Sequence, residues 1–324
     1  MAVGVRPRSE LAVAAGLQVG MRGGITVNSR MQTSDPDIYA AGDCVEIPHL
    51  VSGKRTVFPL GSLANREGRV AADNIAGMVS ELKGAVGSFI VKAFDLAVGC
   101  VGLPLATAQA EGFAADISWS SPMDRAHFFP DRGLLNIGLV FDRKSRKVLG
   151  LQGAGPANDA LSVRIDAAAA AITAGAIIDD IGIIEMAYAP PFNSAIDPVN
   201  AAAYIADNLC LGLMRQINLA DFNGWMADPS SHPDWLVIDV RHAIEAEPYM
   251  AKYGGQWLSL PYDQIRARYG ELPVDKQLVI FCNAGSRSFE VQVFLAQCGI
   301  KNTVVVPGGF NLLHRMGVGW LPVE

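Results

Sequence analysis

The segment QLVIFCNAGSRSFEVQVFLAQ, residues 277–297, decides the fold of the last third of the chain. Its opening run QLVIF is typical of a short strand buried in a parallel sheet. The pattern from Phe289 to Gln297 is that of a helix. The intervening CNAGSRS therefore places Cys282 where a strand ends and a helix begins, and the N–H groups of a helix start favour an anion.

Three residues of this segment suit Cys282 to nucleophilic chemistry. Gly285 lets the backbone turn tightly, Arg287 adds a permanent positive charge, and Ser288 stands in register with them. We expect this loop to stabilise a thiolate that holds a persulfide or meets an oxyanion, provided that solvent reaches it. The alternative interpretation is that Cys282 only packs at the end of a buried strand.

Two further runs belong to the same domain: WLVIDV (235–240) and TVVVPGG (303–309). With helical segments between the strands, they predict a small doubly wound α/β domain. For Asp239 and Arg241, a structural ion pair or hydrogen bond is favoured over a catalytic role.

The loop CNAGSRS resembles the active site of the rhodanese family, C-x-x-G-x-R-[ST], and VIDVRHAIE (237–245) and VVVPGGF (304–310) extend the resemblance. LSLPYDQI (258–265) resembles the family's later turn, whereas YGGQWLSLP (253–261) departs from its usual His-Ile-x-Gly-Ala. The resemblance implies a sulfurtransferase in which Cys282 carries sulfane sulfur. Only four residues separate Cys282 from Arg287, which disfavours a phosphatase-like or arsenate-handling loop because those have five.

A second motif is TSDPDIYAAGDC, residues 33–44. Gly42 has no side chain to hold a cofactor away, and the Asp43 carboxylate can accept hydrogen bonds from sugar-alcohol hydroxyls. A plain strand-ending turn is the alternative. The motif resembles the second flavin motif of the pyridine nucleotide-disulfide oxidoreductases, in which the matching Asp binds the ribityl chain of FAD.

The segment PLGSLANREGRVAADNIAG, residues 59–77, resembles the helix whose N-terminal end faces the flavin in that family. The resemblance makes Leu60, Gly61 and Ser62 candidate flavin neighbours and Asn65 a weaker candidate on the substrate side. It also implies FAD as the cofactor. The first flavin motif, the redox-active cysteine and the NAD(P)H-binding unit are absent from this sequence, so the resemblance is to the C-terminal part of such an enzyme.

YAPPFNSAIDPVN, residues 188–200, resembles the interface domain of coenzyme A-disulfide reductases and NADH-dependent persulfide reductases, some of which carry a fused rhodanese domain. There the tyrosine that matches Tyr188 reaches across a homodimer, and packing under the Pro-Pro turn is the alternative role. The resemblance implies thiols, persulfides or coenzyme A derivatives as small-molecule partners. A truncated, redox-inactive dimerisation scaffold with at most rhodanese activity stays open as the second function, and exposed apolar surface with low solubility is expected of it.

The fold expected from these motifs is multidomain, α/β and α+β. Residues 1–80 form a partial FAD-binding α/β unit, residues 85–208 an α+β dimerisation domain, residues 209–217 a mainly helical linker that extends to about Trp225, and residues 218–324 the rhodanese-like doubly wound α/β domain. Strands are expected near residues 24–27, 38–41, 89–100, 127–141 and 148–153, and helices near residues 60–76 and 161–174.

Composition narrows the classes further. The 324 residues carry a net charge of −6 with a pI near 5.4 and no dense basic run, which argues against a nucleic-acid partner. We expect no membrane span and a cytoplasmic location. The five cysteines contain no C-x-x-C, so a disulfide framework or a metal site is not expected.

Overall fold

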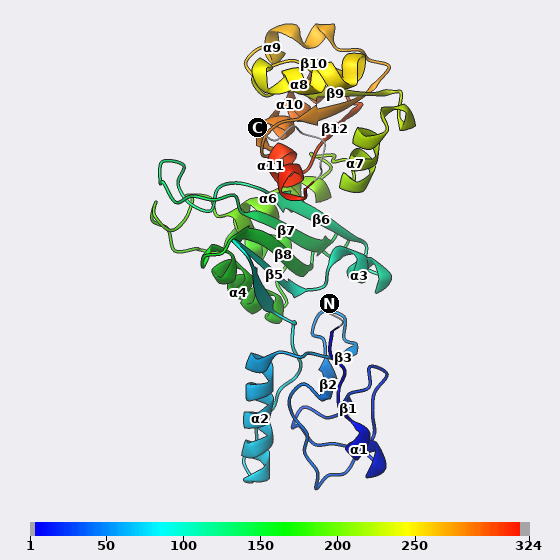
Figure 1. Ribbon diagram of the computed structural model, residues 1–324, viewed down its shortest axis with the longest axis vertical. Helices are drawn as coiled ribbons and strands as arrows, with labels where there is room; N and C mark the ends of the chain where they lie inside the picture. Colours follow the sequence, from blue (N-terminus) through cyan, green and yellow to red (C-terminus); the bar gives the residue numbers. More distant parts are fainter. Residues whose placement is uncertain (1–3, 318–324) are drawn as a thin grey trace.

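The computed structural model describes residues 4–317, and three β-sheets follow one another along the chain. Figure 1 shows them as three units stacked along the long axis, with the N-terminal unit at the bottom. The strands of the sheets lie within residues 25–57, 89–156 and 235–305, respectively.

The first sheet is small. Its order is β1-β2-β3, from β1 (Ile25–Thr26), β2 (Val45–Pro48) and β3 (Arg55–Val57). The helix α2 (Gly61–Ile75) packs its buried Leu63 and Val70 against this sheet, and the short α1 (Glu10–Ala14) precedes β1. The prediction of a strand at residues 38–41 is wrong, because within this range only Tyr39 forms an isolated bridge. The Asp35 side chain accepts a hydrogen bond from the Asp37 N–H group and holds the preceding residues in a turn.

The second sheet is antiparallel, with the order β4-β5-β8-β7-β6. Its strands are β4 (Phe89–Ala93), β5 (Leu96–Gly102), β6 (Ala115–Ser120), β7 (Asn136–Asp142) and β8 (Val148–Pro156). The single strand expected over residues 89–100 is a hairpin that turns at Phe94. The strand expected over residues 127–141 begins only at Asn136, because the preceding turn is held by the Gly133 N–H group, which donates to the Asp124 carboxylate at 2.9 Å.

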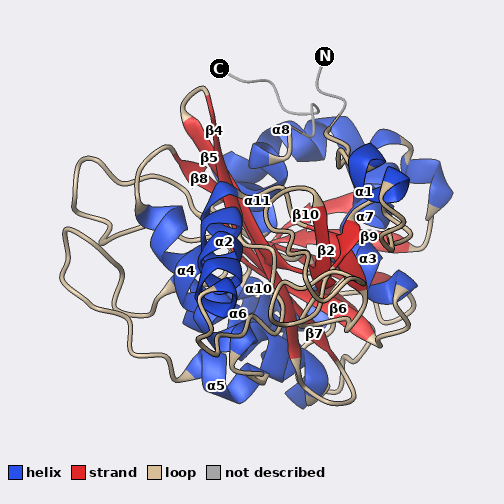
Figure 2. Ribbon diagram, turned by 90° about the horizontal axis from the view of Figure 1, so that it is seen from below, coloured by secondary structure: helices blue, strands red, loops and turns tan. Residues whose placement is uncertain are grey.

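One face of the second sheet is covered by α4 (Ala160–Thr173) and α6 (Pro198–Cys210), as Figure 2 shows. Gly99 and Gly153 lie under this layer, and the side chains of Ile165 and Leu161 approach them closely. The other helices of this unit are α3 (Leu105–Ala110) and α5 (Ile178–Gly182). The opposite face of the sheet carries Val98, Cys100 and Trp119, among others, and turns toward the third unit.

The covering helices are tied together by a buried ion pair. Arg164 on α4 donates from Nε to the Asp197 carboxylate at 3.0 Å, and both side chains are 1% exposed. Arg164 also donates to the Asn193 side chain at 2.6 Å. Asp197 caps α6 by accepting from the Val199 N–H group, and Pro198 occupies the first helical position. The loop before α6 is therefore anchored at its C-terminal end.

The third sheet is parallel throughout, with the order β10-β9-β11-β12, as expected for a doubly wound α/β unit. Its strands are β9 (Trp235–Asp239), β10 (Trp257–Ser259), β11 (Gln277–Phe281) and β12 (Thr303–Val305). Its helices are α7 (Leu219–Ala227), α8 (Ala243–Tyr253), α9 (Ile265–Arg268), α10 (Ser286–Gln297) and α11 (Gly309–Arg315), with short 3-10 turns at Pro229–Ser231, Gly254–Gln256 and Tyr269–Glu271.

The connection between the second and third units is not helical over residues 211–218, where a turn at residues 211–212 is followed by an irregular segment. The expected helical linker is therefore wrong in its middle and is found only at its ends, in α6 and α7. Gln216 forms a parallel bridge with Val305, and the Ile217 N–H group donates to the Val305 carbonyl at 3.0 Å, so this segment adds to the edge of the third sheet. The Gln216 side chain donates to the Ile117 carbonyl of β6 at 2.8 Å. The connection thus binds both sheets that it joins.

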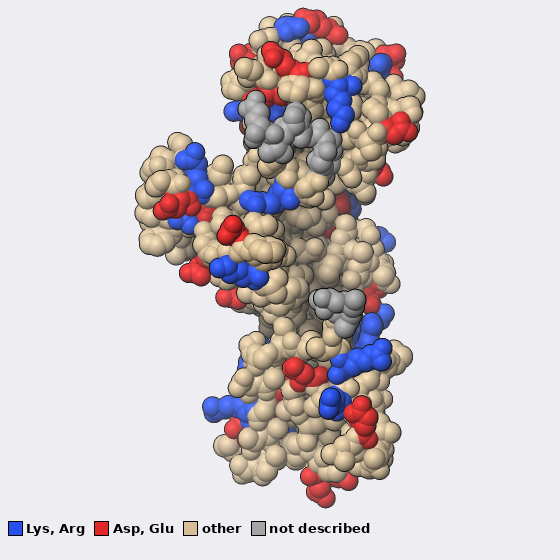
Figure 3. Space-filling view, in the orientation of Figure 1, with Lys and Arg blue, Asp and Glu red and all other residues tan. Residues whose placement is uncertain are grey.

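Three properties of the described residues bear on function. None of the helices within residues 4–317 has the length and apolar character that crossing a membrane requires. On the face seen in Figure 3, Lys and Arg side chains are interspersed with Asp and Glu. The described residues also hold no group of three or more His, Cys, Asp or Glu that could bind a metal ion.

We predict that Arg164→Leu lowers the free energy of unfolding of the second unit by roughly 3–5 kcal/mol, because it leaves the Asp197 charge buried and unpaired. Arg69→Leu is the matched control: Arg69 is 81% exposed in its side chain and pairs with Asp73 at 3.7 Å, so its loss costs no more than about 0.5 kcal/mol. Urea denaturation followed by circular dichroism measures both. Equal losses in the two variants would contradict the assigned role of Arg164.

Candidate functional site

Cys282 follows β11 directly and lies at the start of α10, where the sequence places it. The Gly285 N–H group donates to the Cys282 Sγ at 3.1 Å. Gly285 has a φ of +92° and precedes the first residue of α10, so a residue without a side chain is needed for this turn. One backbone dipole of the helix start therefore points at the sulfur, as the chemistry of a stabilised thiolate requires.

The Cys282 loop is closed in this structure, because Cys282 is only 1% exposed. The N-terminal end of α11 lies against it: Phe310 donates its N–H to the Cys282 carbonyl and Asn311 donates its N–H to the Asn283 carbonyl, both at 2.9 Å. A Cβ atom at Gly309 would overlap the Cys282 carbonyl oxygen. Access of a donor molecule to the thiol therefore requires movement of the loop or of α11.

The two other residues predicted for this loop have contrasting positions. Ser288 is fully buried in the first turns of α10, and its hydroxyl has no hydrogen-bond partner within residues 4–317. Arg287 is exposed and forms no hydrogen bond or ion pair with another described residue. The Arg287 side chain is thus at the surface, while Ser288 lies in the interior.

Asp239 and Arg241 form a structural ion pair, as the sequence favours. Arg241 donates to both carboxylate oxygens of Asp239, at 3.0 and 2.8 Å, and both residues are buried. The Arg241 guanidinium stacks on Phe281 and Phe310 at 4.9 and 5.3 Å from the ring centroids. This contact fixes Phe281, the residue that precedes the cysteine, against the start of α11.

The predicted flavin edge is formed by the Gly42–Asp43 turn and the beginning of α2. Gly42 has a φ of +92°, and its Cβ position would lie 3.7 Å from the Cβ atom of Ala64 on α2. The Asp43 carboxylate is exposed and has no partner among the described residues. The turn thus presents an unpaired carboxylate beside a helix end, which suits hydrogen bonding to hydroxyl groups.

The sequence analysis missed a buried acid beneath this turn. The Gly42 N–H group donates to the Glu67 carboxylate at 2.6 Å, and Glu67 is 2% exposed. Burial raises the pKa of Glu67, and the Gly42 hydrogen bond opposes this shift. The signal that could have identified it is a charge on the apolar side of α2, four residues from Leu63 and three from Val70.

The N-terminal end of α2 has no side-chain cap and opens into a cleft shared with α4. Leu60, Gly61 and Ser62 line a cavity of about 330 Å³ together with Ser162 and Asp166. A neighbouring cavity of about 620 Å³ extends between α2, the segment 82–88 and α4. The predicted flavin neighbours therefore line open space. The Leu60 N–H group donates to the Phe58 carbonyl at 2.8 Å, whereas the N–H groups of Gly61 and Ser62, at the uncapped helix start, favour an anionic or electron-rich partner.

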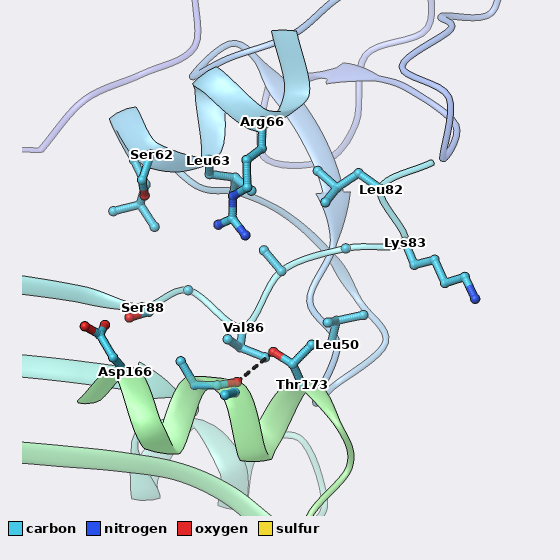
Figure 4. Close-up of a pocket in the computed structure, with 16 residues that line it drawn as sticks. Leu50, Ser62, Leu63, Arg66, Leu82, Lys83, Val86, Ser88, Asp166 and Thr173 are labelled. Atoms are coloured by element: carbon cyan, nitrogen blue, oxygen red, sulfur yellow. Dashed lines mark hydrogen bonds between the residues drawn. The ribbon is translucent and has the colours of Figure 1, made fainter. Parts of the chain in front are cut away.

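Arg66 is a further residue of this cleft that sequence reasoning did not identify. Figure 4 shows its guanidinium reaching into the space between α2 and the segment that carries Val86, whereas Lys83 extends away on the other side. Asn65 is exposed, and its side chain donates to the Gly61 carbonyl of its own helix at 2.8 Å. Within the larger cavity, Arg66 is thus the cation placed to meet a negatively charged ligand.

Tyr188 lies in the loop before α6 and is 53% exposed. Phe192 in the same loop is 75% exposed and Phe128 in a neighbouring loop is 65% exposed. The two loops meet through the Ala126 N–H group, which donates to the Pro190 carbonyl at 3.3 Å. No contact among residues 4–317 brings Tyr188 together with Cys282 or with the Gly42 turn.

Comparison with protein families matches two parts of the chain. Residues 1–58 match the pyridine nucleotide-disulphide oxidoreductase family, and residues 88–199 match the dimerisation domain of that family. A curated relative, the NAD(P)H sulfur oxidoreductase (CoA-dependent) of Pyrococcus furiosus, is 37% identical over 205 residues, which are 63% of this chain and 46% of the relative. The chain thus spans about half the length of the curated relatives that it matches.

Solved structures extend the likeness to nearly the whole chain. A NAD-dependent persulfide reductase from A. fulgidus matches 95% of the chain with a TM-score of 0.84, and reduced Bacillus anthracis CoADR-RHD matches 97% with a TM-score of 0.86. Both are 35% identical to this chain, which covers 54% and 55% of their respective lengths. The arrangement of all three units is therefore shared with these two proteins.

The raised pKa of Glu67 predicts the pH dependence of the first unit. Because the folded pKa lies above the unfolded one, the stabilisation from this group is fully present below the unfolded pKa and is lost as the pH rises through the folded pKa. Glu67→Gln cannot ionise and keeps an acceptor for Gly42. We therefore expect the Tm of the wild type, relative to Glu67→Gln, to fall in thermal melts as the pH rises above about 4, the ordinary pKa of glutamic acid. If the Tm of the wild type and the Tm of Glu67→Gln changed in parallel with pH, Glu67 would not have the raised pKa of a buried acid.

Proposed function

Because residues 1–58 and 88–199 belong to the pyridine nucleotide-disulphide oxidoreductase family, we propose that this chain contributes to a coenzyme A-dependent disulfide or persulfide reductase. In this proposal the first unit supplies one edge of the flavin site, the second unit forms a homodimer, and the third unit, from about residue 218, is a rhodanese-like sulfurtransferase. The single observation that carries the sulfurtransferase is the Gly285 N–H group directed at the Cys282 sulfur.

Sulfur transfer in the third unit proceeds in two displacements. The Cys282 thiolate attacks the sulfane sulfur of a donor such as thiosulfate or a persulfide, the donor's S–S bond breaks, and sulfite or a thiolate leaves. Cys282 then carries the sulfur as a persulfide, whose terminal anion lies where the start of α10 favours negative charge. An acceptor thiolate takes the outer sulfur and restores the Cys282 thiolate.

Entry of the donor requires the loop to open, and two glycines lie at the junction that closes over it. Gly308 and Gly309, between β12 and α11, have φ values of +66° and +57°. Residues with a side chain adopt this backbone conformation only with strain. The exposed Arg287 guanidinium meets the anionic donor outside the closed loop. In this scheme Arg287 binds the donor, and Gly285 and the helix start stabilise the charge on sulfur.

The first unit has features that fit one edge of FAD. The Asp43 carboxylate would accept hydrogen bonds from the ribityl hydroxyls, and the uncapped N–H groups of Gly61 and Ser62, with Leu60 beside them, would face the ring. FAD, when bound, supplies hydride and electron transfer between NAD(P)H and a thiol or disulfide. The residues of this chain would position the cofactor and hold negative charge near the helix end.

The larger cavity is the proposed place for the anionic part of a coenzyme A derivative. Several relatives are named for coenzyme A, and phosphate groups pair well with arginine because the guanidinium forms two parallel hydrogen bonds. Arg66 extends into this cavity, and Asn65 lies one position away on the same exposed helix. Tyr188, exposed on the second unit, would reach the partner subunit of the proposed homodimer.

The burial of Cys282 favours a second candidate function. A thiol that stays closed under α11 would leave a dimerisation scaffold without sulfur transfer. The two functions differ in whether a small anionic donor modifies Cys282.

We predict that Cys282→Ser lowers sulfide release from thiosulfate with dithiothreitol to the level without protein, a loss of about a thousandfold or more. The matched control is Cys298→Ser at the end of α10, where the side chain is exposed, and this variant should keep the wild-type rate. Equal rates for wild type and Cys282→Ser would overturn the sulfurtransferase assignment.

A second variant tests the donor-binding role. Arg287→Ala should raise the KM for thiosulfate by about tenfold, because one charge-assisted contact to the dianion is lost, with a smaller effect on kcat. Raising the ionic strength should weaken donor binding in the wild type more than in this variant. A fall in kcat at unchanged KM would contradict the role of Arg287 in binding.

A further inference from the structure

A third cavity lies between the open face of the second sheet and α11, and the proposed chemistry does not use it. Its volume is about 500 Å³. Phe89, Val98 and Trp119 line it from the sheet, and Leu312 and Met316 line it from α11. Ala154, which has a small side chain, lines the cavity from the same face of the sheet, whereas the Trp119 ring already covers the position beside Gly138.

The floor of this cavity holds a polar side chain that has no partner. Asn136 on β7 is 2% exposed, and neither its amide nitrogen nor its amide oxygen has a hydrogen-bond partner within residues 4–317. A buried donor or acceptor without a hydrogen-bond partner destabilises the fold, because the group has lost its contact with water and gained nothing in return. An amide that leaves both groups unmet is therefore suited to an occupant that meets both at once.

A second amide lies beside Asn136 on the same face. Gln152 on β8 lines the cavity, and its Nε2 atom is also buried without a partner. The register pairs Asn136 with Ala154 and Gly138 with Gln152, so the two amides are diagonal neighbours on adjacent strands. The terminal torsions of Asn and Gln are soft, so both amide planes can rotate toward an occupant.

The rim of the cavity adds one charge. Arg315 on α11 lines it, is half-buried and forms no ion pair with another described residue. Cys100, also in the lining, contributes no charge, because burial raises the pKa of its thiol to about 11. The lining thus combines aromatic and aliphatic walls, an unmet amide at the floor and an unpaired cation at the rim.

We propose that this cavity binds a planar aromatic or heteroaromatic carboxylate that carries a lactam edge. The adjacent N–H and C=O groups of a lactam match the acceptor and donor of the Asn136 amide, and the carboxylate meets Arg315. The flat ring of the ligand lies beside Trp119 and over Ala154, whose small side chain leaves room in the lining. Cys282 is not part of the lining, so binding at this site can be measured whether or not the chain transfers sulfur.

Three related probes separate the parts of the proposal. Quinolin-2-one-4-carboxylate has the ring, the lactam and the carboxylate, quinoline-4-carboxylate lacks the lactam, and quinolin-2-one lacks the carboxylate. Isothermal titration of the full chain should give a Kd of about 1 mM or tighter for the first probe. The probe without the lactam should bind about tenfold more weakly.

Two variants assign these differences to residues. Asn136→Leu should weaken binding of the lactam carboxylate about tenfold and leave quinoline-4-carboxylate unchanged, and its Tm should not fall because no hydrogen bond is lost. Arg315→Ala should weaken both carboxylates by up to about fivefold and leave quinolin-2-one unchanged. Circular dichroism checks that each variant is folded.

Ala154→Leu fills the cavity and should abolish binding of all three probes, whereas Val163→Leu on the exposed side of α4 should change nothing. The proposal is overturned if the lactam carboxylate gives no binding at 1 mM, or if it binds Ala154→Leu as tightly as the wild type. It is equally overturned if Asn136→Leu, once folded, weakens the probes with and without the lactam by the same factor.

Discussion

The contact between the Cys282 loop and the start of α11 determines how the C-terminal part of the chain is packed. The Cys282 loop receives two hydrogen bonds from the start of α11, and a Cβ atom at Gly309 has no room beside it. The second unit joins the same junction, because the Asn311 side chain donates to the Ser121 carbonyl at 3.0 Å. A Cβ atom at Gly308 would lie 2.9 Å from the Ser121 Oγ. The reactive loop and the contact between the two units are therefore one packed region, and movement of α11 alters both.

The first unit has a similar arrangement at the proposed flavin edge. Gly42, at positive φ, lies against α2 and donates to the buried Glu67, which fixes the turn relative to the helix start. The unpaired Asp43 carboxylate and the uncapped helix end are then held on one side of the cleft that α4 completes. Gly42 donates its N–H to the Glu67 carboxylate, and Gly285 donates its N–H to the Cys282 sulfur. In each case a glycine at positive φ orients the N–H group, and a helix begins nearby, whose dipole favours negative charge.

Local patterns predicted the parts of this structure that short segments determine. The Cys282 strand–loop–helix, the parallel third sheet and the helix after Gly42 all follow from apolar runs, glycines and the start of helical periodicity. Errors arose where distant residues decide the conformation: the linker pairs with Val305, and the turn before β7 is held by Asp124. The closure over Cys282, the buried Glu67 and the unmet Asn136 amide are also products of tertiary packing. No local pattern shows which helix covers a loop or which polar group loses its partner.

The central claim is that the closed Cys282 loop opens to a sulfur donor and keeps the sulfur as a persulfide. Mass spectrometry of peptides from protein treated with thiosulfate, after trapping with an alkylating agent, tests it most directly. The account predicts an addition of about 32 Da on the peptide that contains Cys282 and none on Cys210, which is also partly enclosed. An unmodified Cys282, or equal modification of both cysteines, would contradict it.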